Sequence, residues 1–214
     1  MIINILNLTK TNSNLYKKTY SKSIYIQKRV IDFSFIFLLF IITSPIMLYS
    51  LYRIKKESFG TIFFKQPRIG KNGKVFTCYK FRSMHQGDKN FNHYTQDNDL
   101  RVFPYGKIMR KYRIDELPQL FNILKGDMHL IGPRAEWDIL VKNYEKVIPD
   151  YHQRHIVKPG ITGLAQVSYP YGCNIEDAKE KLKYDLKYIK EWSLKNEIAI
   201  IIKTITVIVQ KKGI

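Results

Sequence analysis

The chain has 214 residues, which is enough for one domain with a hydrophobic core and too few for two substantial domains plus several membrane spans. Its 36 Lys and Arg residues outnumber 18 Asp and Glu residues, and the net charge of +18 calls for an anionic partner such as nucleic acid, lipid headgroups or a phosphorylated substrate. The two cysteines, Cys78 and Cys173, stand far apart without ligand-spaced neighbours, which argues against a disulfide framework and a zinc site.

The N-terminal region divides into a cationic lead-in, residues 1–27, and a membrane helix, residues 28–56. The first 31 residues contain basic side chains and no acid. From Phe33 to Tyr52 the chain then runs for 20 residues without a charge, which corresponds to about 30 Å of helix, the thickness of the hydrocarbon core of a bilayer. Both flanks of this run are basic, so they indicate no direction across a membrane and suit two cytoplasmic ends.

Ser44-Pro45 interrupts this apolar run. Proline removes a backbone donor, and the Ser44 hydroxyl can satisfy the carbonyl that is thereby freed, so we expect a kink at this point. Sequence physics leaves two interpretations open: a kinked helix that spans the membrane, or a re-entrant helix that returns to the side from which it entered.

The remaining residues, 57–214, predict an α+β domain. Residues 61–66 and 74–82 read as strands of a small β-hairpin, joined through an Asn-Gly turn within residues 70–73. Amphipathic helices are expected over residues 117–125, ending at Gly126, then over 136–148 and 175–192. Residues 194–209 are apolar over most of their circumference with lysines spaced around them, which favours a helix in the membrane interface over a buried core helix.

Asp115 and Glu116 stand directly before the apolar stripe that begins at Leu117. Acidic residues at a helix start are ordinary capping chemistry, worth about 1 kcal/mol. The surrounding cations, Arg110 upstream and Arg134 after the next turn, instead favour a phosphate site. There a carboxylate can attack phosphorus, and a second carboxylate can hold a divalent metal.

Two further carboxylate features are candidates for a functional site. Asp185 falls on the apolar face of the 175–192 helix, so it needs a cationic or hydrogen-bonding partner, either structural or in an active site. Asp97 and Asp99 form a DxD pattern, by which many glycosyltransferases hold a metal and a nucleotide sugar. Three residues in a polar loop are a weak signal, and the chain lacks the strand and helix alternation on which such enzymes are built.

Taken together, these segments resemble the monotopic phosphoglycosyl transferases, a bacterial sugar transferase family that starts glycan assembly on polyprenyl phosphate. The likeness covers nearly all of residues 28–212. It is carried by KRVIDF before the apolar run with Ser44-Pro45, then FFKQPRIGKNGKVFTCYKFRSM, RIDELPQLFNILKGDMHLIGPR, VKPGITGLAQV and YDLKYIKEWS. Several long motifs in one order are more specific than any one of them, and the short length resembles the minimal form of the family.

The resemblance implies transfer of a sugar phosphate from a UDP-sugar to polyprenyl (undecaprenyl) phosphate, with release of UMP. Asp115 would be the nucleophile that carries the phosphosugar, and Glu116, together with Asp115, would hold Mg²⁺. Substrate-binding positions would be Arg134, Arg110, Lys80, Arg82 and Asp185. Ser44 and Pro45 would break a re-entrant helix, leaving a catalytic domain on the cytoplasmic face of the inner membrane, in contact with membrane lipid.

One position departs from the family pattern. The usual Pro-Arg-Pro reads Pro133-Arg134-Ala135, which retains the phosphate-binding arginine but brings the rigidity of the following turn into question. Neither the sugar nor the oligomeric state can be read from the sequence.

Two alternatives remain at this point. One is a peripheral glycosyltransferase that uses Asp97 and Asp99 on a lipid-linked acceptor. The other is a non-enzymatic, membrane-anchored cationic binding protein. Nucleic acid is not expected as a partner, because the basic residues cluster around carboxylates rather than alternating with aromatic side chains.

Overall fold

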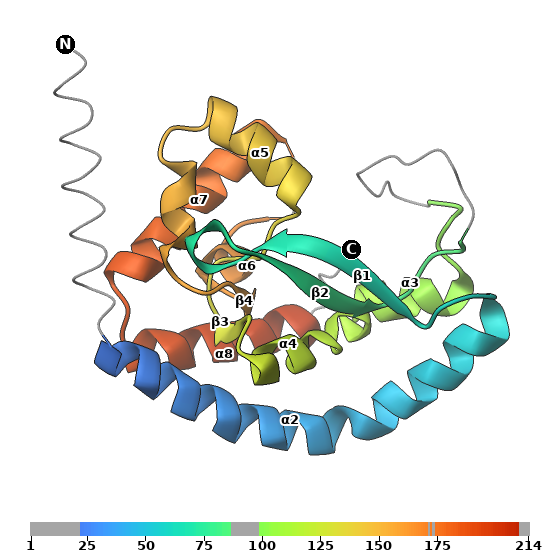
Figure 1. The fold of residues 1–214 in the computed structure, drawn as a ribbon. Helices are drawn as coiled ribbons and strands as arrows, with labels where there is room; N and C mark the ends of the chain where they lie inside the picture. The colour runs from blue at the N-terminus through green and yellow to red at the C-terminus, as the bar shows by residue number, and fades with distance from the viewer. Residues whose placement is uncertain (1–21, 87–98, 171, 173, 210–214) are drawn as a thin grey trace, which may run out of the picture.

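A long bowed helix underlies the whole molecule (Figure 1). The computed structural model describes residues 22–86, 99–170, 172 and 174–209. Helix α2, Lys22–Glu57, curves beneath the other elements, so that both of its ends rise toward the same domain. It begins before residue 28, the predicted start of the membrane helix. It is long and apolar enough to cross a membrane, with a mean hydropathy of 2.2 over its most apolar stretch, of which only 17% is buried.

Helix α2 continues through Pro45 instead of ending there. Proline cannot donate to the carbonyl one turn earlier, that of Ile41, and the Ser44 hydroxyl donates to this carbonyl at 3.0 Å. The predicted substitution of a hydroxyl for the missing backbone donor is therefore confirmed, within a helix that bends gradually.

The predicted hairpin is present. Strands β1, Phe63–Ile69, and β2, Val75–Phe81, pair antiparallel with Phe63 opposite Phe81. The tip is the 3-10 turn η1, Lys71–Gly73, in which Asn72 adopts a left-handed conformation with φ 56°. The hairpin lies over the concave side of α2 (Figure 1).

The central part of the chain consists of short elements. Helix α3 spans Pro104–Lys111, the 3-10 turn η2 spans Ile114–Glu116, and helix α4 spans Gln119–Lys125. Helix α4 ends at Gly126, with φ 86°, as the sequence predicts. Asp115 and Glu116 belong to η2, so the interpretation of Asp115 as the cap of the following helix is wrong: Pro118 occupies that position.

A parallel strand pair, which the sequence did not predict, follows α4. Strand β3, His129–Ile131, pairs with β4, Gly160–Thr162. Between them lie helix α5, Asp138–Val147, and the 3-10 helix η3, Tyr151–Ile156. The chain ends with helices α6, Leu164–Ser168, α7, Ile175–Lys190, and α8, Leu194–Val209. The predicted 136–148, 175–192 and 194–209 helices are thus confirmed within two residues at each end.

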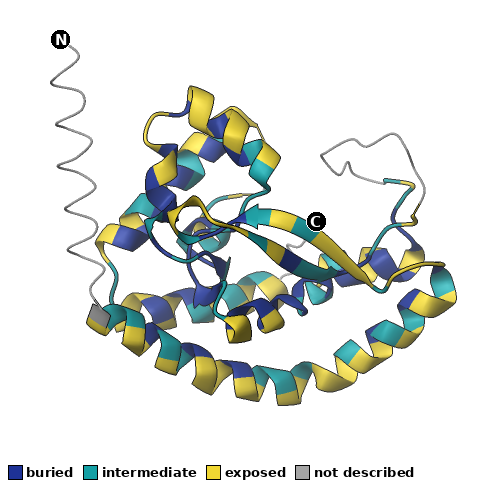
Figure 2. Ribbon diagram, in the orientation of Figure 1, coloured by how far each residue is buried: buried dark blue, intermediate teal, exposed yellow. Residues whose placement is uncertain are grey.

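The main core lies where α2, α4, β3, α7 and α8 meet. It contains Ile36, Ile123, Ile131, Ile189 and Ile200, among other buried side chains. The outer face of α2 stays exposed (Figure 2), and its exposed residues are mostly apolar. A second cluster packs Phe81 of β2 and Ile54 of α2 with residues beside η2, so the hairpin, η2 and β3 all lie above α2, and the fold is α+β.

Candidate active site

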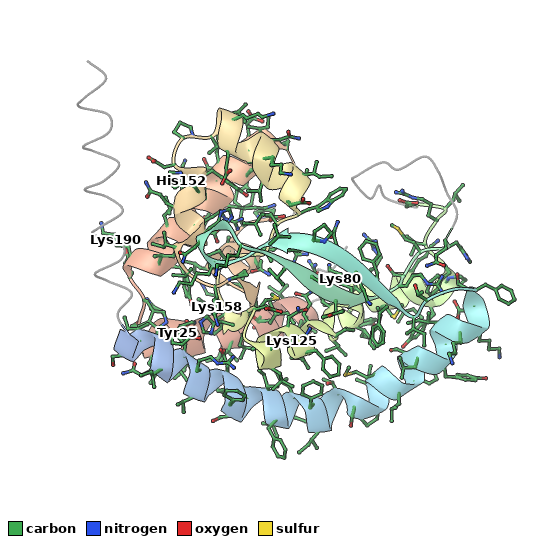
Figure 3. All side chains as sticks on the ribbon, viewed as in Figure 1. Tyr25, Lys80, Lys125, His152, Lys158 and Lys190 are labelled. Atoms are coloured by element: carbon green, nitrogen blue, oxygen red, sulfur yellow. The ribbon has the colours of Figure 1, made fainter. Side chains whose placement is uncertain are left out.

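Glu116 lies at the centre of cations that three segments supply. Its Oε1 atom accepts hydrogen bonds from Lys80 Nζ and from Arg134 Nη2, each at 2.8 Å, and Arg113 Nη1 lies 3.9 Å away. Burial alone would raise the pKa of Glu116, but the three cations outweigh burial and hold this pKa well below its ordinary value. Glu116 is therefore an anion at neutral pH. It fixes Lys80 of β2 (Figure 3) and Arg134 beside η2.

Asp115, in contrast, has an unpaired oxygen. The side chain is buried, and its Oδ1 atom has no hydrogen-bond partner among the described residues. Burial raises the pKa of Asp115, the charge of Glu116 raises it further, and Lys80 and Arg110 act in the opposite direction. Two adjacent carboxylates thus differ in character: one is held by ion pairs, and the other has a buried oxygen without a hydrogen-bond partner among the described residues.

Two arginines before η2 contribute to this environment. Arg110, in the last turn of α3, lies close enough for its charge to lower the pKa of Asp115. Arg113 adopts a left-handed conformation, φ 59° and ψ 20°, which is uncommon for a residue with a side chain. This sharp turn between α3 and η2 lets Arg110, Arg113 and Asp115 approach the same point.

Asp185, for which its place on an apolar helix face predicts a cationic or hydrogen-bonding partner, is paired with Arg154. Its Oδ2 atom accepts from Arg154 Nε at 2.8 Å, and both side chains are almost fully buried. Arg154 Nη2 also donates to the backbone carbonyl of Arg134 at 2.9 Å. Asp185 therefore acts through Arg154 on the segment that carries Arg134. The helical pattern predicted a cationic or hydrogen-bonding partner, but nothing in the sequence singled out Arg154.

Close backbone packing against Gly160 also fixes the segment that carries Arg134. A Cβ atom at Gly160 would lie 2.0 Å from the Gly132 nitrogen, so only glycine fits there. The Gly160 nitrogen donates to the Pro133 carbonyl at 2.9 Å, and Arg134 forms an isolated bridge with Gly160. The strand pair β3–β4 thereby places Arg134 beside η2.

The turn after Arg134 is held in place although alanine replaces the usual second proline. Ala135 is buried, and its carbonyl accepts a hydrogen bond from Arg68 of β1. One residue further on, the Glu136 carbonyl accepts from the Ile69 nitrogen at 3.1 Å. Contacts with β1 therefore hold this turn in the absence of a second proline ring.

Arg82, proposed from the resemblance as a substrate-binding residue, does not join this cluster. Its guanidinium donates to the Thr61 carbonyl, to both the hydroxyl and the carbonyl of Ser58, and to the Met84 carbonyl. These contacts tie the end of β2 to the residues that follow α2. The described contacts of Arg82 are therefore structural.

The DxD alternative receives no structural support from the part of it that is described. Asp97 lies outside the described residues. Asp99 forms an ion pair with Arg101, and the hydrogen bond from Arg101 lowers the pKa of Asp99 to about 2. This carboxylate is therefore already neutralised by a neighbour two residues away.

Comparison with known proteins identifies the family of this chain. Residues 23–211 match the family model described as bacterial sugar transferase. A protein from Aeromonas hydrophila named UDP-N-acetylgalactosamine-undecaprenyl-phosphate N-acetylgalactosaminephosphotransferase is 47% identical over 79% of this chain and 40% of its own length. The undecaprenyl-phosphate galactose phosphotransferase of Salmonella typhimurium is 36% identical over 97% of this chain and 43% of its own.

A third relative is closer to this chain in length. The UDP-glucose:undecaprenyl-phosphate glucose-1-phosphate transferase of Caulobacter vibrioides is 38% identical over 84% of this chain and 68% of its own. The chain spans less than half the length of the first two relatives. Because the family model covers nearly all of it, the chain belongs to the bacterial sugar transferase family.

Proposed function

We propose that this protein transfers a sugar phosphate from a UDP-sugar to polyprenyl phosphate and releases UMP. The observation that carries the proposal is the pair of unlike carboxylates: Glu116 is bound through its Oε1 atom by Lys80 and Arg134, whereas the buried Oδ1 of Asp115 has no partner among the described residues. The names of the relatives, which act on UDP-sugars and undecaprenyl phosphate, support the same substrates.

The chemistry would proceed in two displacements at the sugar-linked phosphorus. In the first, an Asp115 oxygen attacks this phosphorus, the bond to the bridging oxygen breaks, and UMP leaves with the electron pair. In the second, a phosphate oxygen of polyprenyl phosphate attacks the same phosphorus and frees Asp115, which yields a polyprenyl diphosphate sugar. Arg134 and Arg110 would stabilise the negative charge that grows on the phosphoryl oxygens.

The two carboxylates also fit Mg²⁺. This ion prefers oxygen ligands and binds through one or two carboxylates plus substrate phosphates and water. Asp115 and Glu116 would be the protein's share of the ligands, and within the described residues no third His, Cys, Asp or Glu side chain joins them in a metal-binding group. When bound there, Mg²⁺ would neutralise diphosphate charge.

We also propose that α2 is re-entrant, with residues 57–214 as a catalytic domain on the cytoplasmic face of the inner membrane. Both halves of α2 bind that one domain. In the N-terminal half, Lys28 Nζ donates to the Ile131 carbonyl at 2.9 Å. In the C-terminal half, Ser50 and Tyr105 share a hydrogen bond of 2.8 Å, and Glu57 accepts from the Tyr105 nitrogen. A helix spanning straight across a bilayer would carry one of these contacts to the other side.

The exposed side chains support a shallow membrane position. The outer face of α2 presents Val30, Phe37 and Leu48, each more than half exposed, and α8 presents Ile202 and Ile205. Apolar side chains in such numbers are stable against lipid rather than water. α2 would therefore enter the hydrocarbon core, and α8 would lie in the interface.

The test of the activity is a membrane preparation incubated with a panel of UDP-sugars, with release of UMP and a covalent phosphosugar adduct on Asp115 as readouts. Asp115→Asn should abolish both. Asp150→Asn is the matched control, because Asp150 is exposed and has φ 61°, a conformation that Asn tolerates. Normal turnover by Asp115→Asn would overturn the mechanism, and UDP as the product would favour the DxD alternative.

A further inference from the structure

Three cations converge on Tyr25 at the N-terminal end of α2, away from Asp115. Lys158 Nζ donates to the Tyr25 hydroxyl at 2.9 Å and lies 5.0 Å from the centre of its ring, and Lys71 Nζ lies 5.7 Å from the same centre. The third cation is Arg29, one turn along α2 from Tyr25. We call these four residues the Tyr25 cluster.

Gly126 lies next to two cations of this cluster. A Cβ atom at Gly126 would lie 3.4 Å from Lys158 Nζ and 3.8 Å from Arg29 Nη2, so both cations approach a residue that has no side chain. Arg29 donates to the carbonyls of Ile123 and Leu124 at the end of α4. Three segments distant in sequence, namely α2, η1 and the residues before β4, thus bring positive charge to one place.

Within the described residues, no carboxylate forms an ion pair with Arg29, Lys71 or Lys158. The acceptors given above for Arg29 and Lys158 are neutral oxygens. Two acids close to these cations in sequence are hydrogen-bonded to other groups, Asp32 to His129 and the Leu130 nitrogen and Asp127 to Asn122, and neither forms an ion pair with the cluster within the described residues. Three like charges that are held together in this way favour a bound anion.

The exposed apolar face of α2 begins beside these cations. Ile26, Val30 and Phe33 are 52%, 61% and 50% exposed, and the Arg29 guanidinium lies 4.4 Å from the centre of the Phe33 ring. A ligand that meets both surfaces carries a phosphate and hydrocarbon chains. We propose that the Tyr25 cluster binds the phosphodiester headgroup of an anionic phospholipid, whose acyl chains lie along α2. This inference rests on the proposed membrane position of α2.

A resident lipid fits the location better than the acceptor substrate does. Figure 3 shows Tyr25 and Lys158 together at one end of α2, and Lys80, which marks the reaction centre, well apart from them. Polyprenyl phosphate in the Tyr25 cluster would hold its phosphate away from Asp115. The cluster would instead fix the N-terminal end of α2 at the level of the headgroups, where anionic lipid contributes binding energy for each nearby cation.

The test uses the full chain purified in a zwitterionic detergent, without UDP-sugar, and titrates it with dioctanoyl phosphatidylglycerol. The thermal unfolding midpoint should rise in a saturable manner, and dioctanoyl phosphatidylcholine should give no such rise. Lys71→Gln and Lys158→Gln should each raise the half-saturating lipid concentration about fivefold. Lys142→Gln, which removes a lysine with a 72% exposed side chain from α5, is the matched control and should not change it.

Several outcomes would overturn the inference. The wild type and the Lys71→Gln/Lys158→Gln double variant could respond equally, inorganic phosphate could produce the same shift, or polyprenyl phosphate could displace the lipid in competition. Lys158→Arg should retain the lipid response, which separates loss of charge from misfolding. Asp115→Asn should also retain it, so a failure here is distinguishable from a failure of the proposed catalytic function.

Discussion

Asp115 and Glu116 are adjacent in sequence, but their charges have opposite effects on the free energy of unfolding. Asp115→Asn removes a buried charge that lacks full compensation, so the free energy of unfolding should rise by about 1 kcal/mol at neutral pH. Glu116→Gln takes the anion from Lys80 and Arg134, so it should lower that free energy by about 2 kcal/mol. Thermal unfolding of both variants in one detergent checks the signs, and two destabilised variants would contradict this account.

The same difference predicts how activity and stability depend on pH. Attack requires ionised Asp115, whose pKa is raised, so UMP release should decline on acidification at a higher pH than an ordinary aspartate would give. The raised pKa favours the folded state below the unfolded value of 3.8, and this contribution is lost as pH rises through the folded pKa. The stability advantage of Asp115→Asn should therefore vanish in acid and grow toward neutral pH. An advantage that is constant with pH would argue against the raised pKa.

At the scale of elements, the packing of β3 on β4 depends on one missing side chain. Gly160→Ala would place a Cβ atom 2.0 Å from the Gly132 nitrogen, and neither backbone can move without shifting Arg134. We expect a loss of stability on the order of 2 kcal/mol or more and a large fall in UMP release. Gly73→Ala is a useful comparison, because Gly73 has a positive φ of 74° but no atom of the described residues lies within 4 Å of the added Cβ atom. It should lose some stability yet keep its catalytic rate per folded molecule.

The two ends of α2 provide the test of its direction. Ser23→Cys and Lys56→Cys place exposed thiols near either end, in a background in which Cys173 is replaced by serine and Cys78 stays buried. If α2 is re-entrant, a membrane-impermeant maleimide should label both positions only after the cells are opened. Pro45→Ala restores a backbone donor to Ile41 and should favour a straight span, so labelling of one end should then appear in intact cells. Labelling of either end in intact cells without this change would contradict the re-entrant arrangement.

Elements with a local pattern could be predicted from the sequence, and elements defined by distant partners could not. The hairpin followed from Asn72-Gly73 between two β-rich stretches, α7 followed from apolar periodicity, and α8 followed from a segment that is apolar over most of its circumference. The pair β3–β4 was missed because each strand has three residues and its partner lies about 30 residues away, too short and too distant for a periodic signal. At the site, Asp115 and Glu116 could be chosen as the candidate pair, whereas their unlike environments arise from burial and from Lys80, which only the fold brings close.

At the scale of the whole molecule, α2 and α8 are joined through buried charge. Lys28, 1% exposed, donates to Glu197 Oε1 at 2.8 Å, and the same oxygen accepts from Tyr188 and Trp192. Neither partner is visible as a pair in the sequence: Lys28 looks like an ordinary basic flank, and Glu197 lies in the first turn of α8. The contact links the N-terminal end of α2 to α8, the last described helix. Lys28 also donates to the Ile131 carbonyl, so the same side chain joins both helices to β3.

This buried pair leads to a prediction about the coupling of the two ends of the chain. Lys28→Met leaves Glu197 buried without its cation, and Glu197→Gln leaves Lys28 in the same situation, so each single variant should lose about 3 kcal/mol of stability. The double variant Lys28→Met/Glu197→Gln buries no unpaired charge, so it should be more stable than either single variant. Thermal unfolding of all four proteins measures this coupling. Additive losses would mean that the two side chains act independently. In that case α2 would be held to the domain chiefly by the apolar contacts of Ile36 and by Asp32, which binds His129 and the Leu130 nitrogen.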